Sequence, residues 1–130
     1  MARALKKLYT EVFDFKPTTA QLATVGPTTF PMFPVYAGWR VLCADINITE
    51  LFTAGAPTIE VGDGTNVDGF IEAADITIGT AGIYQGIAAF HTDQLGKLYT
   101  TDDTVDLVYT GDALTTAGVA RVVCIMFREF

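Results

Sequence analysis

Short runs of β-forming residues alternate with turn clusters of Gly, Asp and Thr along most of this 130-residue chain. The clearest example is residues 57–71, PTIEVGDGTNVDGFI, in which two apolar runs flank an acidic turn bracketed by glycines. From Trp39 onward, no stretch combines a helical period with helix caps. The pattern predicts an all-β domain, and nothing in it has the residue spacing of a reaction centre.

The expected elements follow from apolar alternation. We expect a first strand at residues 8–15, a helical turn near residues 19–24, and the longest strand at residues 35–51. A bend is expected near Asp45, because the apolar side chains change face there. Further strands are expected at residues 59–61, 83–90, 98–99, 105–109 and 119–127, whereas residues 67–71 and 73–78 are ambiguous.

The number and spacing of these strands indicate the architecture. Eight or nine strands with frequent breaks favour an antiparallel β-sandwich of jelly-roll-like type. The last strand is apolar on both faces, which is typical of a central strand or of a subunit seam. A lipocalin-type barrel fits less well, because the strands are uneven in length and a proline-rich segment interrupts them.

Four of the five prolines fall within residues 17–34. Proline has no backbone N–H to donate to a sheet, so this segment cannot form a central strand. We interpret it as an extended arm or an edge connection. The expected organisation is therefore an N-terminal strand and proline-rich arm at residues 1–34 and a sandwich body at residues 35–130.

Half of the residues are hydrophobic, which is high for a free monomer. The longest uninterrupted apolar run, residues 122–127, is far shorter than the ~20 residues that a membrane-spanning helix needs. A subunit interface explains the apolar content better, and no membrane partner is expected. The candidate interface residues lie in the N-terminal segment: Lys6, Lys7, Phe13, Phe15, Phe30, Met32 and Phe33.

The formal net charge of −7 argues against a nucleic-acid partner, whose phosphates would repel this surface. Residues 1–16 hold four basic and two acidic residues, whereas the remaining 114 hold four basic and thirteen acidic ones. The N-terminal segment could dock on a neighbouring acidic body or remain solvated, and the sequence supports both alternatives equally. Because residues 1–7 lead into no apolar core, we expect no secretory signal.

The residues needed for common catalytic centres are missing. The chain contains no serine, so a Ser-His-Asp triad is impossible, and His91 is the only histidine. Cys43 and Cys124 lie in apolar strands, where a thiolate is disfavoured. We expect them to be buried, reduced thiols, with a disulfide between them as the alternative. The sequence predicts neither an enzyme nor a cofactor.

The acidic turn at residues 63–69 raises the question of a calcium site. An EF-hand loop starting at Asp63 would need ligands at its fifth and twelfth positions, which are Val67 and Ala74. A looser site could use Asp63, Asn66 and Asp68. The simpler interpretation is a turn that Asp and Asn close by bonding their own backbone, so we expect no metal.

Several of the strand-and-turn motifs occur in a familiar order: INITELF at residues 46–52, PTIEVGDG at 57–64, DGFI at 68–71, DTVDL at 103–107, TAG at 116–118 and the valine-rich terminal strand. In these motifs the chain resembles small virion structural proteins of tailed bacteriophages, especially the jelly-roll-like proteins that decorate or cement the capsid. The resemblance covers about residues 35–128 and carries no catalytic residues.

The resemblance implies a structural protein on the capsid surface of a virion, made in the host cytoplasm, that stabilises contacts between shell subunits. It implies that the partners are the major capsid protein or other virion subunits, and that the protein forms a homo-oligomer, a trimer above all. The alternative is a tail or fibre component that binds carbohydrate. In that role, rings such as those of Trp39, Tyr84 and Tyr99 would stack on sugars, although a Trp in an apolar strand is usually part of the core.

Overall fold

The computed structural model describes residues 7–86 and 96–128. The elements in chain order are β1 (Leu8–Phe15), α1 (Thr19–Leu22), β2 (Gly26–Val35), β3 (Trp39–Thr53), β4 (Thr58–Gly62), the 3₁₀ turn η1 (Ala73–Asp75), β5 (Gly82–Gln85), β6 (Lys97–Leu98), β7 (Asp103–Gly111) and β8 (Ala117–Arg128). The expected strand at residues 83–90 is therefore described only in its first part.

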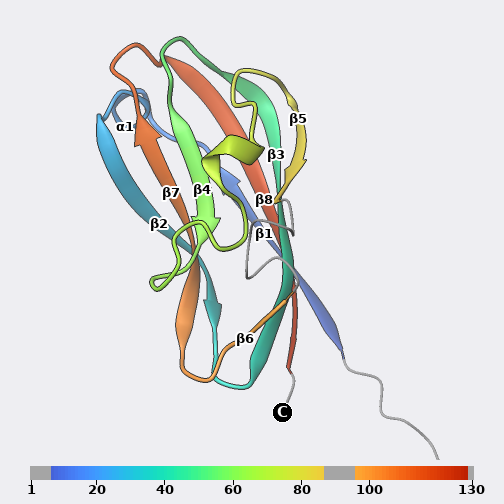
Figure 1. The fold of residues 1–130 in the computed structure, drawn as a ribbon. Coiled ribbons are helices and arrows are strands. Elements are labelled where there is room, and N and C mark those ends of the chain that lie inside the picture. Colours follow the sequence, from blue (N-terminus) through green and yellow to red (C-terminus); the bar gives the residue numbers. More distant parts are fainter. Residues whose placement is uncertain (1–6, 87–95, 129–130) are drawn as a thin grey trace, which may run out of the picture.

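Two antiparallel sheets face each other across one core (Figure 1). The larger sheet has the strand order β1-β8-β3-β5, with β6 also paired to β3, and the smaller sheet has the order β2-β7-β4. The prediction of an all-β antiparallel sandwich is confirmed. As expected from its apolar residues, β8 is a central strand, paired with β1 on one side and β3 on the other.

The N-terminal segment is paired into both sheets, as an edge connection would be. All of β1 pairs with β8, and β2 pairs with β7 from Gly26 to Val35. The described part of this segment therefore contributes one strand to each sheet. The prolines are accommodated because β2 lies at the edge of its sheet and, among the described strands, bonds only to β7. A missing N–H on its other side therefore costs no ladder bond.

The change of face in β3 lies earlier than predicted. The register with β8 shifts between Val41 and Cys43, whereas Asp45 lies in regular register opposite Val123. The bulge lets Val41 before it and Ala44 after it both point into the core. Further shifts occur towards the end of β3.

Local sequence accounts for the short helical elements. Thr18 and Gln21 form a reciprocal capping box at the start of α1, which confirms the predicted helical turn. The ambiguous residues 73–78 begin with η1, and Ile71 makes an isolated bridge to Val61. Neither helical element within residues 7–86 and 96–128 is long and apolar enough to cross a membrane.

An aromatic cluster joins the two sheets. The ring of Phe15 on β1 lies 5.1 Å from that of Phe30 on β2, 6.4 Å from that of Phe52 on β3 and 5.5 Å from that of Tyr109 on β7. The Tyr109 hydroxyl donates a hydrogen bond to the carbonyl of Leu22 at 2.8 Å, which anchors α1 at this end of the sandwich. The N-terminal aromatics thus belong to the core.

Candidate subunit interface

The face of the five-stranded sheet that points away from the other sheet, here called the outer face, carries apolar side chains. Leu8 and Val12 on β1 are 57% and 53% exposed, and they lie opposite Phe127 and Val123 on β8. On β5, Ile83 is 70% exposed. Apolar groups therefore recur across several strands of this face, as at surfaces that contact another protein.

Charged groups border this apolar area. Asp14 on β1 lies directly opposite Arg121 on β8, with 2.7 Å between Asp14 Oδ1 and Arg121 Nε. The hydrogen bond from Arg121 lowers the pKa of Asp14, and the same bond raises the pKa of Arg121. Because both side chains are exposed, this pair contributes little to stability and leaves its charges accessible to a partner.

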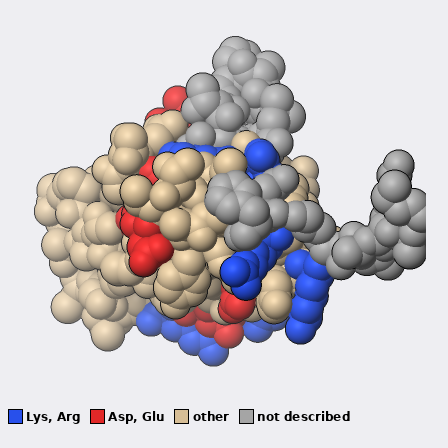
Figure 2. Space-filling model, turned by 90° about the horizontal axis from the view of Figure 1, so that it is seen from below, with Lys and Arg blue, Asp and Glu red and all other residues tan. Residues whose placement is uncertain are grey.

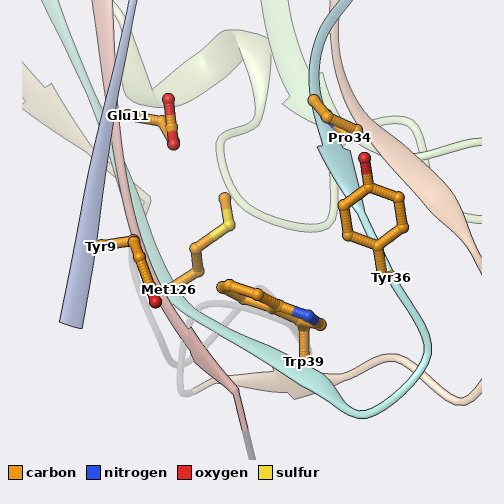
Figure 3. Close-up of a pocket in the computed structure, with 6 residues that line it drawn as sticks. All are labelled: Tyr9, Glu11, Pro34, Tyr36, Trp39 and Met126. Atoms are coloured by element: carbon orange, nitrogen blue, oxygen red, sulfur yellow. The ribbon is translucent and has the colours of Figure 1, made fainter. Parts of the chain in front are cut away.

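A pocket of about 290 Å³ lies between the edge strands β1 and β2, with residues of β3 and β8 also lining it (Figure 3). It is lined by Tyr9, Glu11, Pro34, Tyr36, Trp39 and Met126. The rings of Tyr9 and Trp39 lie 5.1 Å apart, and Tyr36 is 53% exposed. Trp39, which the sequence suggested to be a core residue, is therefore only partly buried and lines this pocket.

The acidic turn closes on itself around Asp63, as predicted. Asp63 Oδ1 accepts hydrogen bonds from the backbone N–H groups of Thr65 at 2.9 Å and Asn66 at 2.8 Å. Asp63 Oδ2 accepts from Lys97 Nζ at 2.6 Å and from the hydroxyl of Tyr99 at 2.7 Å. Asp63 is fully buried, and its two oxygens accept these four hydrogen bonds from within the fold.

The surroundings of Asp63 set its ionisation. Burial raises the pKa of Asp63, but the hydrogen bonds from Lys97 and Tyr99 and the two backbone N–H groups outweigh this, so that its pKa is lowered. Within residues 7–86 and 96–128, no group of three or more His, Cys, Asp or Glu side chains is arranged to hold a metal ion.

Most of the predicted interface aromatics pack inside their own chain. Phe15 and Phe33 are buried, and Phe13, Phe30 and Met32 are partly buried against the core. The sequence pattern could not show this, because apolar residues in a proline-rich segment look uncovered until the opposite sheet is known.

The structure describes only one of the two predicted basic interface residues, Lys7. Lys7 is exposed, and its ammonium lies 4.9 Å from the centre of the Tyr9 ring. Lys6 lies outside the described residues. Whether any of the predicted interface residues contacts a neighbouring subunit stays a prediction. The outer-face residues Leu8, Val12 and Ile83 were missed, although their alternation with inward-pointing neighbours was a usable signal.

Both cysteines are free thiols, as expected, but only Cys124 is buried, whereas Cys43 is half-buried. Cys124 is buried on the inner side of β8, whereas Cys43 lies opposite Ile125 on the outer face, so the two thiols point to opposite sides of the sheet. Burial raises the pKa of Cys124 to about 12 and also raises that of Cys43, which disfavours both thiolates. His91 lies outside the described residues.

Two of the aromatic residues considered for sugar stacking are occupied within the fold. Tyr99 is buried, with its hydroxyl on Asp63, and the hydroxyl of Tyr84 donates to the carbonyls of Thr77 and Thr80. The third, Trp39, lines the pocket described above.

No protein-family model matches the sequence, and no curated protein matches it. Solved structures do match its fold. A chain in the acid-stable capsid structure of Helicobacter pylori bacteriophage KHP30 aligns with a TM-score of 0.66 at 12% identity, over 97% of this chain and 95% of that one. The two chains therefore share a fold. A chain in the capsid asymmetric unit of cyanophage Pam1 also matches, with a TM-score of 0.57 at 20% identity, over 94% of this chain and 84% of that one.

Proposed function

We propose that this protein is a non-enzymatic structural component of a bacteriophage virion that decorates or cements the capsid and stabilises contacts between shell subunits. The proposal rests on the structural match to the KHP30 chain, because the aligned region covers 97% of this chain and 95% of that one. The two chains are therefore nearly equal in length. In that capsid the fold forms a polypeptide of its own and is not a domain within a much larger one.

The outer face supplies a physical means of attachment. Covering exposed side chains such as Leu8, Val12 and Ile83 removes apolar surface from water, at roughly 25 cal/mol per Å². A protein that binds only the assembled shell stabilises that state by mass action. The major capsid protein is the proposed partner, and copies placed around a threefold axis of the shell would form a trimer.

A tail or fibre component that binds carbohydrate is the second candidate. The observation that favours it is the pocket with the rings of Tyr9, Tyr36 and Trp39, because aromatic faces stack on sugar rings. The pocket has one carboxylate, that of Glu11, to accept hydrogen bonds from hydroxyl groups. Glycan binding without capsid attachment would favour this candidate.

The test is to add the purified protein to shells of its phage that lack it, and to measure both occupancy by electron cryomicroscopy and the melting temperature of the shell. We expect bound protein on the capsid surface and a higher melting temperature. Protein found only on tails or fibres, or shells that melt unchanged with the protein bound, would contradict the proposal.

A matched pair of variants tests the attachment surface. Val12 on the outer face and Val67 in the acidic turn are similarly exposed, at 53% and 49%. We expect Val12→Lys to weaken shell binding about tenfold, because a charge would be buried in an apolar contact, and Val67→Lys to leave it unchanged. Equal effects of the two substitutions would show that the outer face is not the attachment surface.

A further inference from the structure

Among the described strands, β1 has an open edge. It pairs with β8, and within residues 7–86 and 96–128 no second strand bonds to residues 8–15. The edge strand β2 contains Pro27, Pro31 and Pro34, which limit pairing with another chain, but β1 contains no proline. The prolines thus protect the β2 edge, whereas the β1 edge can accept an added strand.

The aromatic pocket lies beside this open edge. Tyr9 and Glu11 point from β1 into the pocket, while Pro34 and Tyr36 close its other side (Figure 3). A strand added to β1 would continue the five-stranded sheet, and every second side chain of it would point to the same side as Tyr9 and Glu11. Such a strand would gain backbone hydrogen bonds from the edge and specificity from the pocket.

The lining of the pocket favours a cationic side chain. Faces of Trp and Tyr rings attract Lys and Arg, and the Lys7 ammonium already lies 4.9 Å from the centre of the Tyr9 ring. Within residues 7–86 and 96–128, no basic side chain forms an ion pair with the Glu11 carboxylate. Figure 2 shows basic and acidic groups interspersed at the end where β1 begins, with no single large acidic patch. Binding of a cationic side chain there would therefore depend on its contacts with the pocket rings and with Glu11.

Residues 1–6, MARALK, have the composition that this site requires. They contain Arg3 and Lys6, no acidic residue and three small or branched apolar side chains. Extended, six residues span about 20 Å, enough to pair along most of β1. Residues 5–7, which precede β1 directly, contain no Gly, Pro, Asn or Asp to reverse the chain onto its own β1. Residues 1–6 are therefore better placed to reach the β1 edge of another copy than that of their own chain.

We propose that residues 1–6 of one copy add as a strand to the β1 edge of a second copy, with Arg3 or Lys6 placed in the aromatic pocket against Glu11. The contact joins two copies of this chain and needs no shell protein, so it goes beyond the proposed attachment to a capsid. Because donor and acceptor surfaces differ, repeated contacts of this kind close into a ring when the rotation between copies permits.

The test uses the full chain and its one tryptophan, Trp39, which lines the pocket. Sedimentation and Trp39 emission are measured as the protein concentration is raised. We expect the mass to increase and the emission to shift to the blue as the pocket is covered. The variant with both Arg3→Glu and Lys6→Glu should remain a monomer. Glu11→Gln should weaken association about three- to tenfold, while Glu50→Gln, on another strand, should not.

A synthetic peptide of residues 1–7 provides a second measurement. Added to the charge-reversed full chain, it should shift the Trp39 emission, and the same peptide with Glu in place of Arg3 and Lys6 should not. The proposal is overturned if the peptide leaves Trp39 unchanged, if Glu11→Gln binds it equally well, or if the charge-reversed chain still associates. Since no shell is present, these outcomes leave the proposed capsid function to be judged by its own test.

Discussion

Asp63 Oδ2 and Lys97 Nζ lie 2.6 Å apart and connect the two sheets of the sandwich. Asp63 directly follows β4 of the three-stranded sheet, and Lys97 begins β6, which pairs with β3 of the five-stranded sheet. The Asp63 side chain is fully buried and that of Lys97 is 25% exposed. The pair therefore fastens the acidic turn to the opposite sheet in an environment that screens charge poorly.

Replacing Asp63 by Asn tests this connection. The amide oxygen can still accept from the N–H groups of Thr65 and Asn66, but the charge that Asp63 contributes to its ion pair with Lys97 is lost. We expect the free energy of unfolding to fall by about 2–4 kcal/mol, because the substitution removes the charged acceptor of a partly buried ion pair. Urea unfolding measures this change. Asp68→Asn, in the same turn, is the control and should have a much smaller effect.

The stability should depend on pH in two opposite ways. The lowered pKa of Asp63 means that its contribution is present above about pH 4, the ordinary Asp value, and is lost as the pH falls through the lowered pKa. Burial raises the pKa of Asp106, helped by nearby Asp103, and burial also raises the pKa of Glu60, helped by Asp68. Protonating these two groups favours the folded state.

We therefore expect stability to be maintained or to rise as the pH falls from 7 towards about 5, and to drop below about 4. Urea midpoints at several pH values measure this profile. Asp106→Asn should reduce the gain in mild acid, and Asp63→Asn should flatten the loss at low pH. A profile that falls steadily from neutral pH in the unsubstituted chain would contradict this assignment.

Gly62 is required by a close backbone approach. A Cβ at this position would lie 2.1 Å from the carbonyl oxygen of Asn66 and 2.4 Å from the carbonyl carbon of Val67. We expect Gly62→Ala to destabilise the fold by about 1–3 kcal/mol, because the turn must open to admit the methyl group. At Gly79 a Cβ would meet no atom within 4 Å, so Gly79→Ala should be nearly neutral in thermal unfolding.

A chain that begins at Val35 should fail to fold. It would lack β1 and β2 and so the buried rings of Phe15 and Phe33, each worth roughly 1.5–3 kcal/mol when buried. It would also expose the edges of β8 and β7, which these strands cover. Circular dichroism and thermal unfolding should show no cooperative transition. A folded product would mean that the N-terminal segment is an arm after all.

Local sequence was sufficient to predict elements whose hydrogen bonds and caps lie within a few residues. The first strand at residues 8–15, the capped turn after Thr18 and the closure of the acidic turn around Asp63 all agree with the structure. The alternation of apolar and polar residues was also sufficient to predict the sandwich class, because burial of every second side chain indicates that one face of each strand is covered. It placed the bend of β3 too late, because a bulge at Val41 and Cys43 depends on the register with β8.

Tertiary structure decided where the N-terminal segment belongs and which side chains remain exposed. A proline excludes a central strand, but it does not distinguish a free arm from an edge strand, because both leave the N–H position unpaired. Only the pairing of β2 with β7 settles this, and it joins residues far apart in the sequence, such as Thr28 and Tyr109. Likewise, the pocket beside Trp39 forms from residues far apart in the chain, so no local pattern could reveal it.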